Sequence, residues 1–292
     1  MRMKIAISGT TGFMGGKVSS LFSLQGHEVM PLTREHFKKD AAVLADELHD
    51  VDAIIHLAGA PIMKRWTKRH MHNIYDSRVL TTTKLSDAMH LMAIPPHTFI
   101  CASAVGIYPE TGSHDERSKA VADNFLGKVC SAWEDAAKRV PANSRAIMLR
   151  FGIILGDDGG ALKQMLLPFK MGLGGRIGSG RQMMPWIHVD DALAAIRFVL
   201  ENRKIEGPVN VCAPEAVNNL HFTKTLAKTL NRPAFLPLPA FALKLVFGKG
   251  AMVLTKGQKV VPARLQEHDF TFRFPSLDDA LEHLLKPKKA NK

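Results

Sequence analysis

Short apolar runs alternate with longer segments of helical period along the first half of the chain. This alternation is typical of an α/β protein with a Rossmann-type, doubly wound parallel sheet and helices on both faces. It predicts strands at 4–8, 28–33, 53–58, 98–102 and 145–155, and helices from about 13 to 25, near 41–48, and over 68–92 and 124–140. Apolar runs at 209–212 and near 270–274 continue the pattern. Pro31 is awkward in the second strand, because proline cannot donate a ladder hydrogen bond.

Glycine and proline become frequent after residue 156, which predicts a loop-rich second half. We therefore expect a nucleotide-binding core over 1–155. The remainder, 156–292, is expected to be mainly a smaller C-terminal substrate lobe that is interleaved with the core.

The turn after the first strand contains a dinucleotide-binding fingerprint. Gly9, Gly12 and Gly15 are spaced three apart, follow a strand and open a helix. The first glycine permits a tight turn, the second a close approach to a pyrophosphate, and the third close packing of helix and strand. The free amides of the helix then face the phosphates. We expect cofactor contacts from the whole turn: Gly9, Thr10, Thr11, Gly12, Phe13, Met14 and Gly15. The alternative is a glycine-rich turn that binds nothing.

The end of the second predicted strand decides between the two nicotinamide dinucleotides. A site selective for NAD places a carboxylate there to accept the ribose hydroxyl. This chain has Thr33 and Arg34 instead, and Glu35 comes one position too late. A hydroxyl and an arginine suit the 2′-phosphate of NADP. The sequence therefore favours NADP, and the alternative for Arg34 is a solvated surface side chain.

Composition and charge narrow the function classes. Hydrophobic residues make up 46% and charged residues 23% of the chain, as in ordinary globular proteins. The net charge is +12, but part of it lies in a lysine-rich tail after residue 285, and no basic cluster is interleaved with aromatic residues. We therefore expect no nucleic-acid partner. No apolar run approaches the roughly 20 residues that span a bilayer, so we expect no membrane partner either.

The three cysteines and the start of the chain suggest a compartment. Cys101, Cys130 and Cys212 are odd in number and sit in apolar surroundings, so we interpret them as buried free thiols in a reducing environment. The first residues lead directly into a strand and contain no signal peptide pattern. We expect a cytoplasmic protein.

Several further motifs occur in one order along the chain: 56–60 (HLAGA), 103–108 (SAVGIY), 150–156 (RFGIILG) and 185–191 (PWIHVDD). Together with the glycine turn they resemble the extended and atypical short-chain dehydrogenase/reductase superfamily. Smaller motifs such as 166–169 (LLPF) and 172–175 (GLGG) are similar to its SDR39U1-like epimerase branch. The segment at about 236–285 resembles the C-terminal extension of that branch. The resemblance covers nearly the whole chain.

This resemblance implies further cofactor contacts. Leu57, Ala58 and Gly59 would pass the adenine-ribose and pyrophosphate region, Asn73 and Arg78 would face the cofactor from the next helix, and Ile154 would lie near the nicotinamide. The alternatives are an ordinary surface ion pair for Arg78 and plain strand packing for Leu57, Ala58 and Ile154.

The usual catalytic pair of this superfamily is missing. Ordinary members use a tyrosine whose pKa is lowered by a lysine four residues later. Here Val79 stands four residues after Tyr75, and Gly112 four after Tyr108. The expected region, 124–130, contains Phe125 and no tyrosine. Ser103 and Tyr108 are the candidates for partial replacement, although Tyr108 could equally be a packed loop aromatic. We interpret Cys130 as core.

Other polar residues support weaker interpretations. His188 is expected to cap and position a helix under the substrate lobe rather than to catalyse. Arg176 and Arg181 could form an anion-holding loop or a solvated one. His70 and His72 are two residues apart and project in different directions from a helix, so we expect no metal site there.

Two function classes remain in view. The first is an NADP-dependent oxidoreductase or epimerase-like enzyme that acts on a small molecule with a carbonyl or hydroxyl group. The second is a non-catalytic NADP sensor whose bound cofactor changes a partner surface. A homodimer is possible in either case.

Overall fold

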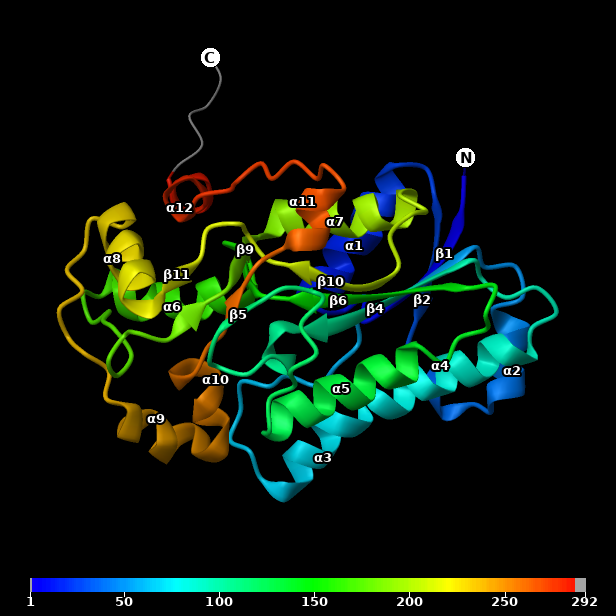
Figure 1. The fold of residues 1–292 in the computed structure, drawn as a ribbon, viewed down its shortest axis with the longest axis horizontal. Coiled ribbons are helices and arrows are strands. Elements are labelled where there is room, and N and C mark those ends of the chain that lie inside the picture. Colours follow the sequence, from blue (N-terminus) through cyan, green and yellow to red (C-terminus); the bar gives the residue numbers. More distant parts are fainter. Residues whose placement is uncertain (1, 287–292) are drawn as a thin grey trace, which may run out of the picture.

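The computed structural model describes residues 2–286, and the lysines of the tail beyond Lys286 lie outside this range. Its centre is a parallel sheet of six strands in the order β10-β6-β4-β3-β1-β2 (Figure 1). The strands are β1 (Lys4–Ser8), β2 (Glu28–Leu32), β3 (Ala53–His56), β4 (Thr98–Ala104), β6 (Arg145–Phe151) and β10 (Gly207–Val211). The predicted doubly wound α/β class is confirmed.

Helices cover both faces of the sheet and make two cores. Ile5 and Ile7 of β1 face the core beneath α1 (Phe13–Leu24), α7 (Val189–Glu201) and α11 (Ala263–Glu267), whereas Ala6 faces α2 (Ala41–Glu47), α4 (Val79–Leu91) and α5 (Phe125–Ala137). Because successive side chains of a strand point to opposite faces, a strand buried on both faces needs a continuous apolar run. This explains why β1 and β3 were visible in the sequence.

The smaller lobe has its own core and lies at the left of Figure 1. It is built from α6 (Gly160–Lys170), α8 (Asn219–Thr229) and α12 (Leu277–Leu285), with two short ladders. One pairs β7 (Ile153–Leu155) with β9 (Trp186–His188), and the other pairs β8 (Met183–Met184) with β11 (Val217–Asn218). After β9 and α7, the chain returns to the central sheet at β10. The predicted boundary between core and lobe at residue 155 stays a prediction.

Short elements connect the lobe with the sheet. A third ladder joins β5 (Ser113–His114) to β12 (Lys259–Val260), and α9 (Ala240–Phe247) and α10 (Met252–Thr255) flank the 3-10 turn η3 (Gly248–Ala251). Two further 3-10 turns are η1 (His36–Lys38) and η2 (Val105–Ile107). Within residues 2–286, no helix is long and apolar enough to cross a membrane.

Three predicted elements differ from the structure. The helix expected over 68–92 is two helices, α3 (Lys68–Asp76) and α4, because the chain breaks at Ser77 and Arg78. The strand expected over 145–155 divides at Gly152 into β6 and β7, which belong to different ladders. The apolar run 270–274 forms no strand; the amides of Arg273 and Phe274 donate instead to the Asp191 carboxylate, both at 2.9 Å.

Pro31 is tolerated in β2 because this strand lies at the edge of the sheet, where only β1 pairs with it.

Candidate functional site

The glycine turn lies at the carboxyl edge of the sheet, between β1 and α1. Gly9 has a φ of +76°, and a Cβ there would lie 2.9 Å from the carbonyl carbon of Leu57. A Cβ on Gly15 would overlap the carbonyl oxygen of Gly9. Side chains at either position would therefore force the turn away from the neighbouring strand end.

The N-terminus of α1 is open to an anion. The first amide of the helix to bond inside it belongs to Gly16, which donates to the Gly12 carbonyl at 3.0 Å. The preceding amides, from Phe13 to Gly15, have no acceptor within the helix. The cap residue Gly12 supplies no side-chain acceptor, and the first turn contains no acidic residue. This end carries a partial positive charge that nothing in the turn neutralises.

A buried hydrogen-bond chain fixes the strand ends beneath the turn. The Ser8 hydroxyl lies 2.6 Å from Nδ1 of His56 and accepts the amides of Leu57 and Ala58 at 3.1 and 3.2 Å. Thr81 donates to the Ser77 carbonyl and lies 3.2 Å from Nε2 of His56. The imidazole therefore donates from Nε2 and accepts from Ser8 at Nδ1. Burial, and then the charge of Arg78, lowers the pKa of His56 to about 3, so the ring is neutral.

The end of β2 presents the two residues that were predicted to select the cofactor. Thr33 and Arg34 follow β2 directly and are exposed. Arg34 forms no ion pair among residues 2–286, whereas Glu35 is paired with Lys38 at 2.8 Å. The guanidinium is thus free to meet a phosphate, and the nearest carboxylate is held by another cation.

Arg78 occupies the break between α3 and α4. Its guanidinium donates to the carbonyl of Ala60 at 3.0 Å and lies 5.2 Å from the ring centre of Trp133. Its Cζ would be 3.0 Å from a Cβ on Gly59. The positive charge therefore sits against the loop after β3, which adjoins the glycine turn, and no carboxylate of the described residues pairs with it.

The other residues that the resemblance placed at the cofactor lie on or next to separate elements. Leu57 packs against both cores of the sheet, and Ile154 packs against the core beneath α1 and α7. Asn73 is exposed on α3. These individual cofactor contacts stay predictions.

Sequence reasoning missed the loop that packs on the Phe13 side chain at the start of α1. A Cβ on Gly156 would lie 2.5 Å from the Phe13 ring, and one on Gly159 would overlap that ring. Lys17 of α1 pairs with Asp158 of the same loop at 2.6 Å. The glycines of 156–160 were visible in the sequence, but their partner 140 residues earlier was not.

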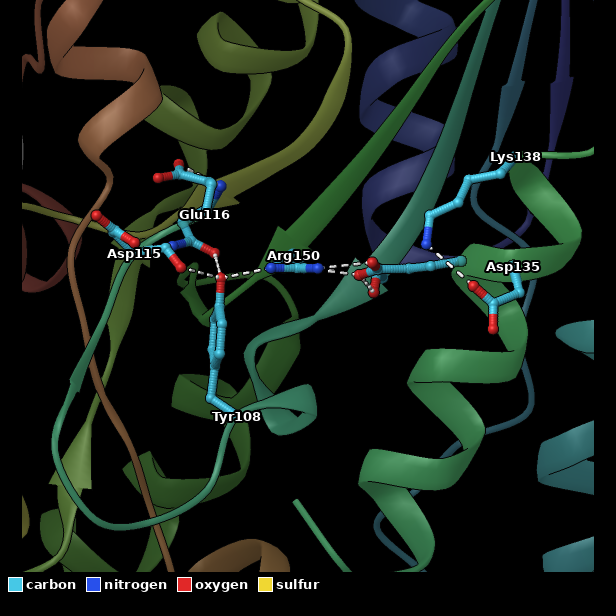
Figure 2. Close-up of polar contacts among 9 residues, drawn as sticks. Tyr108, Asp115, Glu116, Asp135, Lys138 and Arg150 are labelled. Atoms are coloured by element: carbon cyan, nitrogen blue, oxygen red, sulfur yellow. Dashed lines mark hydrogen bonds and ion pairs between the residues drawn. The ribbon is translucent and has the colours of Figure 1, made fainter. Parts of the chain in front are cut away.

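Ser103 and Tyr108 belong to one buried network, and Figure 2 shows its part around Tyr108 and Arg150. Ser103 donates to Glu134 at 2.7 Å, and Glu134 accepts two bonds of 2.7 Å from Arg150. Arg150 also donates to the Tyr108 hydroxyl at 2.6 Å, which in turn lies 2.8 Å from Oδ1 of Asn210. The structure thus brings the two predicted catalytic residues together through an ion pair.

This network holds both hydroxyls inside the protein. The side chain of Tyr108 is fully buried and stacks on His114, with ring centres 5.1 Å apart. Burial raises the pKa of Tyr108 to about 12, although Arg150 opposes the shift. A hollow of about 240 Å³ borders Tyr108, Glu134 and Arg150. The catalytic roles of Ser103 and Tyr108 stay predictions.

The three cysteines are buried and unbridged, as predicted. Burial raises the pKa of the Cys130 thiol to about 12. These thiols are therefore protonated and unreactive at neutral pH.

His188 caps α7, as predicted. Its Nδ1 accepts the amide of Asp190 at 2.9 Å, and its Nε2 lies 3.1 Å from Nδ1 of His283 on α12. Asp190, His188 and His283 place possible ligand atoms within 4.8 Å of one another. Because the cap already uses Nδ1 and Arg273 lies 3.8 Å from the Asp190 carboxylate, this cluster ties α12 to α7 without a free set of ligands.

The fold and the glycine turn define a dinucleotide-binding protein of the Rossmann class. The chain belongs to the NAD dependent epimerase/dehydratase family, whose model matches residues 5–212, and a domain of unknown function, DUF1731, matches residues 238–284. This confirms the resemblance seen in the sequence.

Individual relatives match nearly the whole chain in sequence and in structure. The epimerase family protein YfhF of Bacillus subtilis is 36% identical over 98% of this chain and 99% of its own. A crystal structure of the human epimerase family protein SDR39U1 with NADPH is 35% identical, with a TM-score of 0.88 over 97% of this chain and 99% of that one. A UDP-glucuronic acid 4-epimerase from Bacillus cereus, 18% identical with a TM-score of 0.78, shares the fold.

Proposed function

We propose that this chain is an NADP-dependent oxidoreductase or epimerase-like enzyme that acts on a small carbonyl or hydroxyl substrate. The observation that carries the proposal is the open N-terminus of α1 next to an exposed Arg34 that lacks a competing carboxylate. The crystal structure of the human relative with NADPH supports the same cofactor.

The residues of this chain fit the parts of NADP. The amides from Phe13 to Gly15 would hold the pyrophosphate, since they lack acceptors in the helix. Thr33 and Arg34 would hold the 2′-phosphate by a charge-assisted contact. Arg78, at the break between α3 and α4, would add a positive charge against the loop after β3. When bound, the nicotinamide supplies the hydride, and the protein orients the substrate and stabilises developing charge.

Proton transfer falls to Ser103 or Tyr108, in the absence of the usual pair. With a pKa of about 12, Tyr108 keeps its proton at neutral pH and acts as a hydrogen-bond donor rather than as a base. Ser103 could polarise a carbonyl but is a weak acid. This chemistry suits a slow reduction better than a two-way epimerisation.

A specific observation favours the second function class, a non-catalytic NADP sensor. Both candidate hydroxyls are already satisfied inside the protein, Ser103 by Glu134 and Tyr108 by Arg150 and Asn210. A sensor needs the cofactor site without a free proton donor.

The cofactor site is tested by calorimetric titration of NADPH and NADH into the wild type and Arg34→Ala. A charged hydrogen bond contributes roughly 1.5–3 kcal/mol, so the variant should lose about 10- to 100-fold in NADPH affinity and keep its NADH affinity. Arg203→Ala, an exposed arginine ahead of β10 at the opposite edge of the sheet, is the control. Absence of nucleotide binding in the wild type would refute both function classes.

Turnover separates the enzyme from the sensor. Bound NADPH should be oxidised by some member of a carbonyl panel if the chain is an enzyme. If no carbonyl oxidises it while binding stays tight, the sensor is favoured. Cytoplasmic function is part of the proposal, since three free, buried thiols suit a reducing compartment.

A further inference from the structure

Exposed apolar side chains gather at the outer edge of the smaller lobe. Sixteen large hydrophobic residues are exposed among the described residues, and nine of them fall in the two short segments 167–173 and 235–246. We define the lobe-edge patch as these nine residues: Leu167, Met171, Leu173, Phe235, Leu236, Leu238, Phe241, Leu245 and Val246. Such a concentration is uncommon on a free surface and marks an interaction site.

The two segments lie side by side. Leu238 donates its amide to the Arg176 carbonyl at 2.8 Å and accepts the amide of Gly178 at 2.9 Å. A Cβ on Gly175 would overlap the carbonyl of Leu236. The nine side chains therefore belong to neighbouring stretches of backbone.

Helix α9 presents its apolar side to solvent. Only Leu243 of this helix is buried, whereas Phe241 and Leu245 are 68% and 70% exposed. The end of the helix is fixed from behind, because Arg65 donates to the Leu245 carbonyl at 2.6 Å. Figure 1 shows α9 at the lower left, away from the central sheet. The folded protein thus holds these side chains outward.

The charge around the patch has one sign. Residues 160–182 and 232–260 contain no aspartate or glutamate. They contain nine basic residues: Lys163, Lys170, Arg176, Arg181, Arg232, Lys244, Lys249, Lys256 and Lys259. Lys256 is paired with Glu110 from outside these segments. The patch is therefore apolar with a basic surround.

We propose that the lobe-edge patch docks the protein on an anionic membrane surface. Outward Phe and Leu side chains can enter the boundary between headgroups and acyl chains, while Lys and Arg reach the lipid phosphates. A symmetric dimer through this patch would bring together two surfaces whose own segments contain basic and no acidic residues, which like-charge repulsion opposes. The expectation of no membrane partner rested on the lack of a spanning run, and peripheral docking requires none.

Vesicle flotation tests the proposal with the full-length protein. Binding is expected to vesicles of phosphatidylcholine with phosphatidylglycerol, to weaken with added salt, and to be much lower on phosphatidylcholine alone. The double variant Phe241→Ser with Leu245→Ser should weaken binding by at least about tenfold, because it removes apolar area that enters the bilayer. Lys244→Glu with Lys249→Glu should also weaken it.

The matched control is Leu24→Ser with Ile94→Ser, which removes apolar residues outside the patch that are even more exposed, at 87% and 80%. This control should float like the wild type, and unchanged NADPH titration shows that the patch variants remain folded. The proposal is overturned if the wild type does not bind anionic vesicles or if the patch variants bind as well as the wild type. Light scattering that shows a dimer dissociated by the patch variants would assign the surface to a second copy of the chain.

Discussion

The buried pair of Glu134 and Arg150 gives the sharpest stability prediction. Their side chains are only 2% and 8% exposed, and the carboxylate accepts two bonds of 2.7 Å from the guanidinium. It also accepts the Ser103 hydroxyl at 2.7 Å. Glu134→Gln removes the charge and nearly preserves the shape, so it leaves Arg150 as a buried cation without its counter-ion.

The expected cost follows from this geometry. Breaking a buried ion pair by removing one partner costs about 3–5 kcal/mol, because the other charge stays desolvated. Glutamine keeps one carbonyl acceptor for Arg150, so we expect the lower end, about 3 kcal/mol. Replacing both partners, Glu134→Leu with Arg150→Met, should cost less than the sum of the two single changes, because no charge remains buried.

Urea unfolding followed by circular dichroism measures these differences. Glu282→Gln is the matched control, since Glu282 pairs with Lys286 at 2.7 Å but both side chains are about half exposed. Exposed pairs contribute about 1 kcal/mol or less. If Glu134→Gln were no more destabilising than Glu282→Gln, the pair would not be desolvated as described and the reasoning would fail.

Three further outcomes are expected. Gly15→Ala should abolish NADPH binding in calorimetry, because its Cβ would overlap the Gly9 carbonyl; binding at wild-type affinity would contradict the turn geometry. Tyr108→Phe should cost about 1–3 kcal/mol in urea unfolding by unpairing Arg150 and Asn210, with NADPH affinity unchanged; a large loss of affinity would contradict this. Burial lowers the pKa of His188 to about 4, whereas the pKa of this histidine in the unfolded chain is near 6.5. The unfolded chain therefore takes up the proton first, and the free energy of unfolding falls as the pH drops from about 6.5 to 4. His188→Asn keeps the cap acceptor and should flatten that fall by up to about 3 kcal/mol; an unchanged pH profile would contradict it.

The elements that sequence reasoning located are those whose cause is local. The apolar run of β1 and the glycine spacing before α1 both lie within the first twenty-four residues, so the pattern can be recognised without knowing that the turn packs against Leu57. The same holds for His188, whose side chain caps the helix that follows it. Such features can be predicted from the sequence because the residues that determine them are neighbours in the chain.

The elements it missed depend on distant partners. The break at Ser77 and Arg78 contains no proline or glycine. It is stabilised by the loop after β3, where Ala60 donates to Ser77 at 2.9 Å and accepts from Arg78. At Gly152 the chain leaves β6 and the next amide, that of Ile153, donates to the Pro185 carbonyl at 2.7 Å, an approach that a side chain at position 152 would obstruct. Neither partner is a neighbour in the helix or strand pattern: Ala60 lies in another loop, 17 and 18 residues before Ser77 and Arg78, and Pro185 precedes β9, which belongs to a different ladder from β6.

The candidate site divides in the same way. The nucleotide-binding half, with Gly9 and Arg34, was visible in order along the chain, whereas the network of Tyr108 joins residues up to 102 positions apart. The sequence could therefore indicate Ser103 and Tyr108 as candidates, but it could not predict which side chains surround their hydroxyls. From the sequence, Ser103 and Tyr108 were two polar groups near a sheet edge. In the fold, the two hydroxyls are joined by the buried ion pair of Glu134 and Arg150.

The missing lysine has a partial counterpart in the structure. The stretch 124–130, where the tyrosine and lysine were expected, has Phe125 followed four residues later by Val129, and its Lys128 is exposed and pairs with Asp123 at 2.9 Å. Inside the protein the same stretch carries the buried thiol of Cys130, and the nearby cations Arg78 and Arg150 oppose the rise of that thiol's pKa. Arg78 reaches this place from the break between α3 and α4, and it lies over the ring of Trp133 on α5. A fixed positive charge can bind an anionic cofactor, but without a nearby phenol it cannot create a proton donor with a lowered pKa. Cofactor binding and proton transfer are therefore separable in this protein, so nucleotide affinity and turnover must be measured independently in every variant.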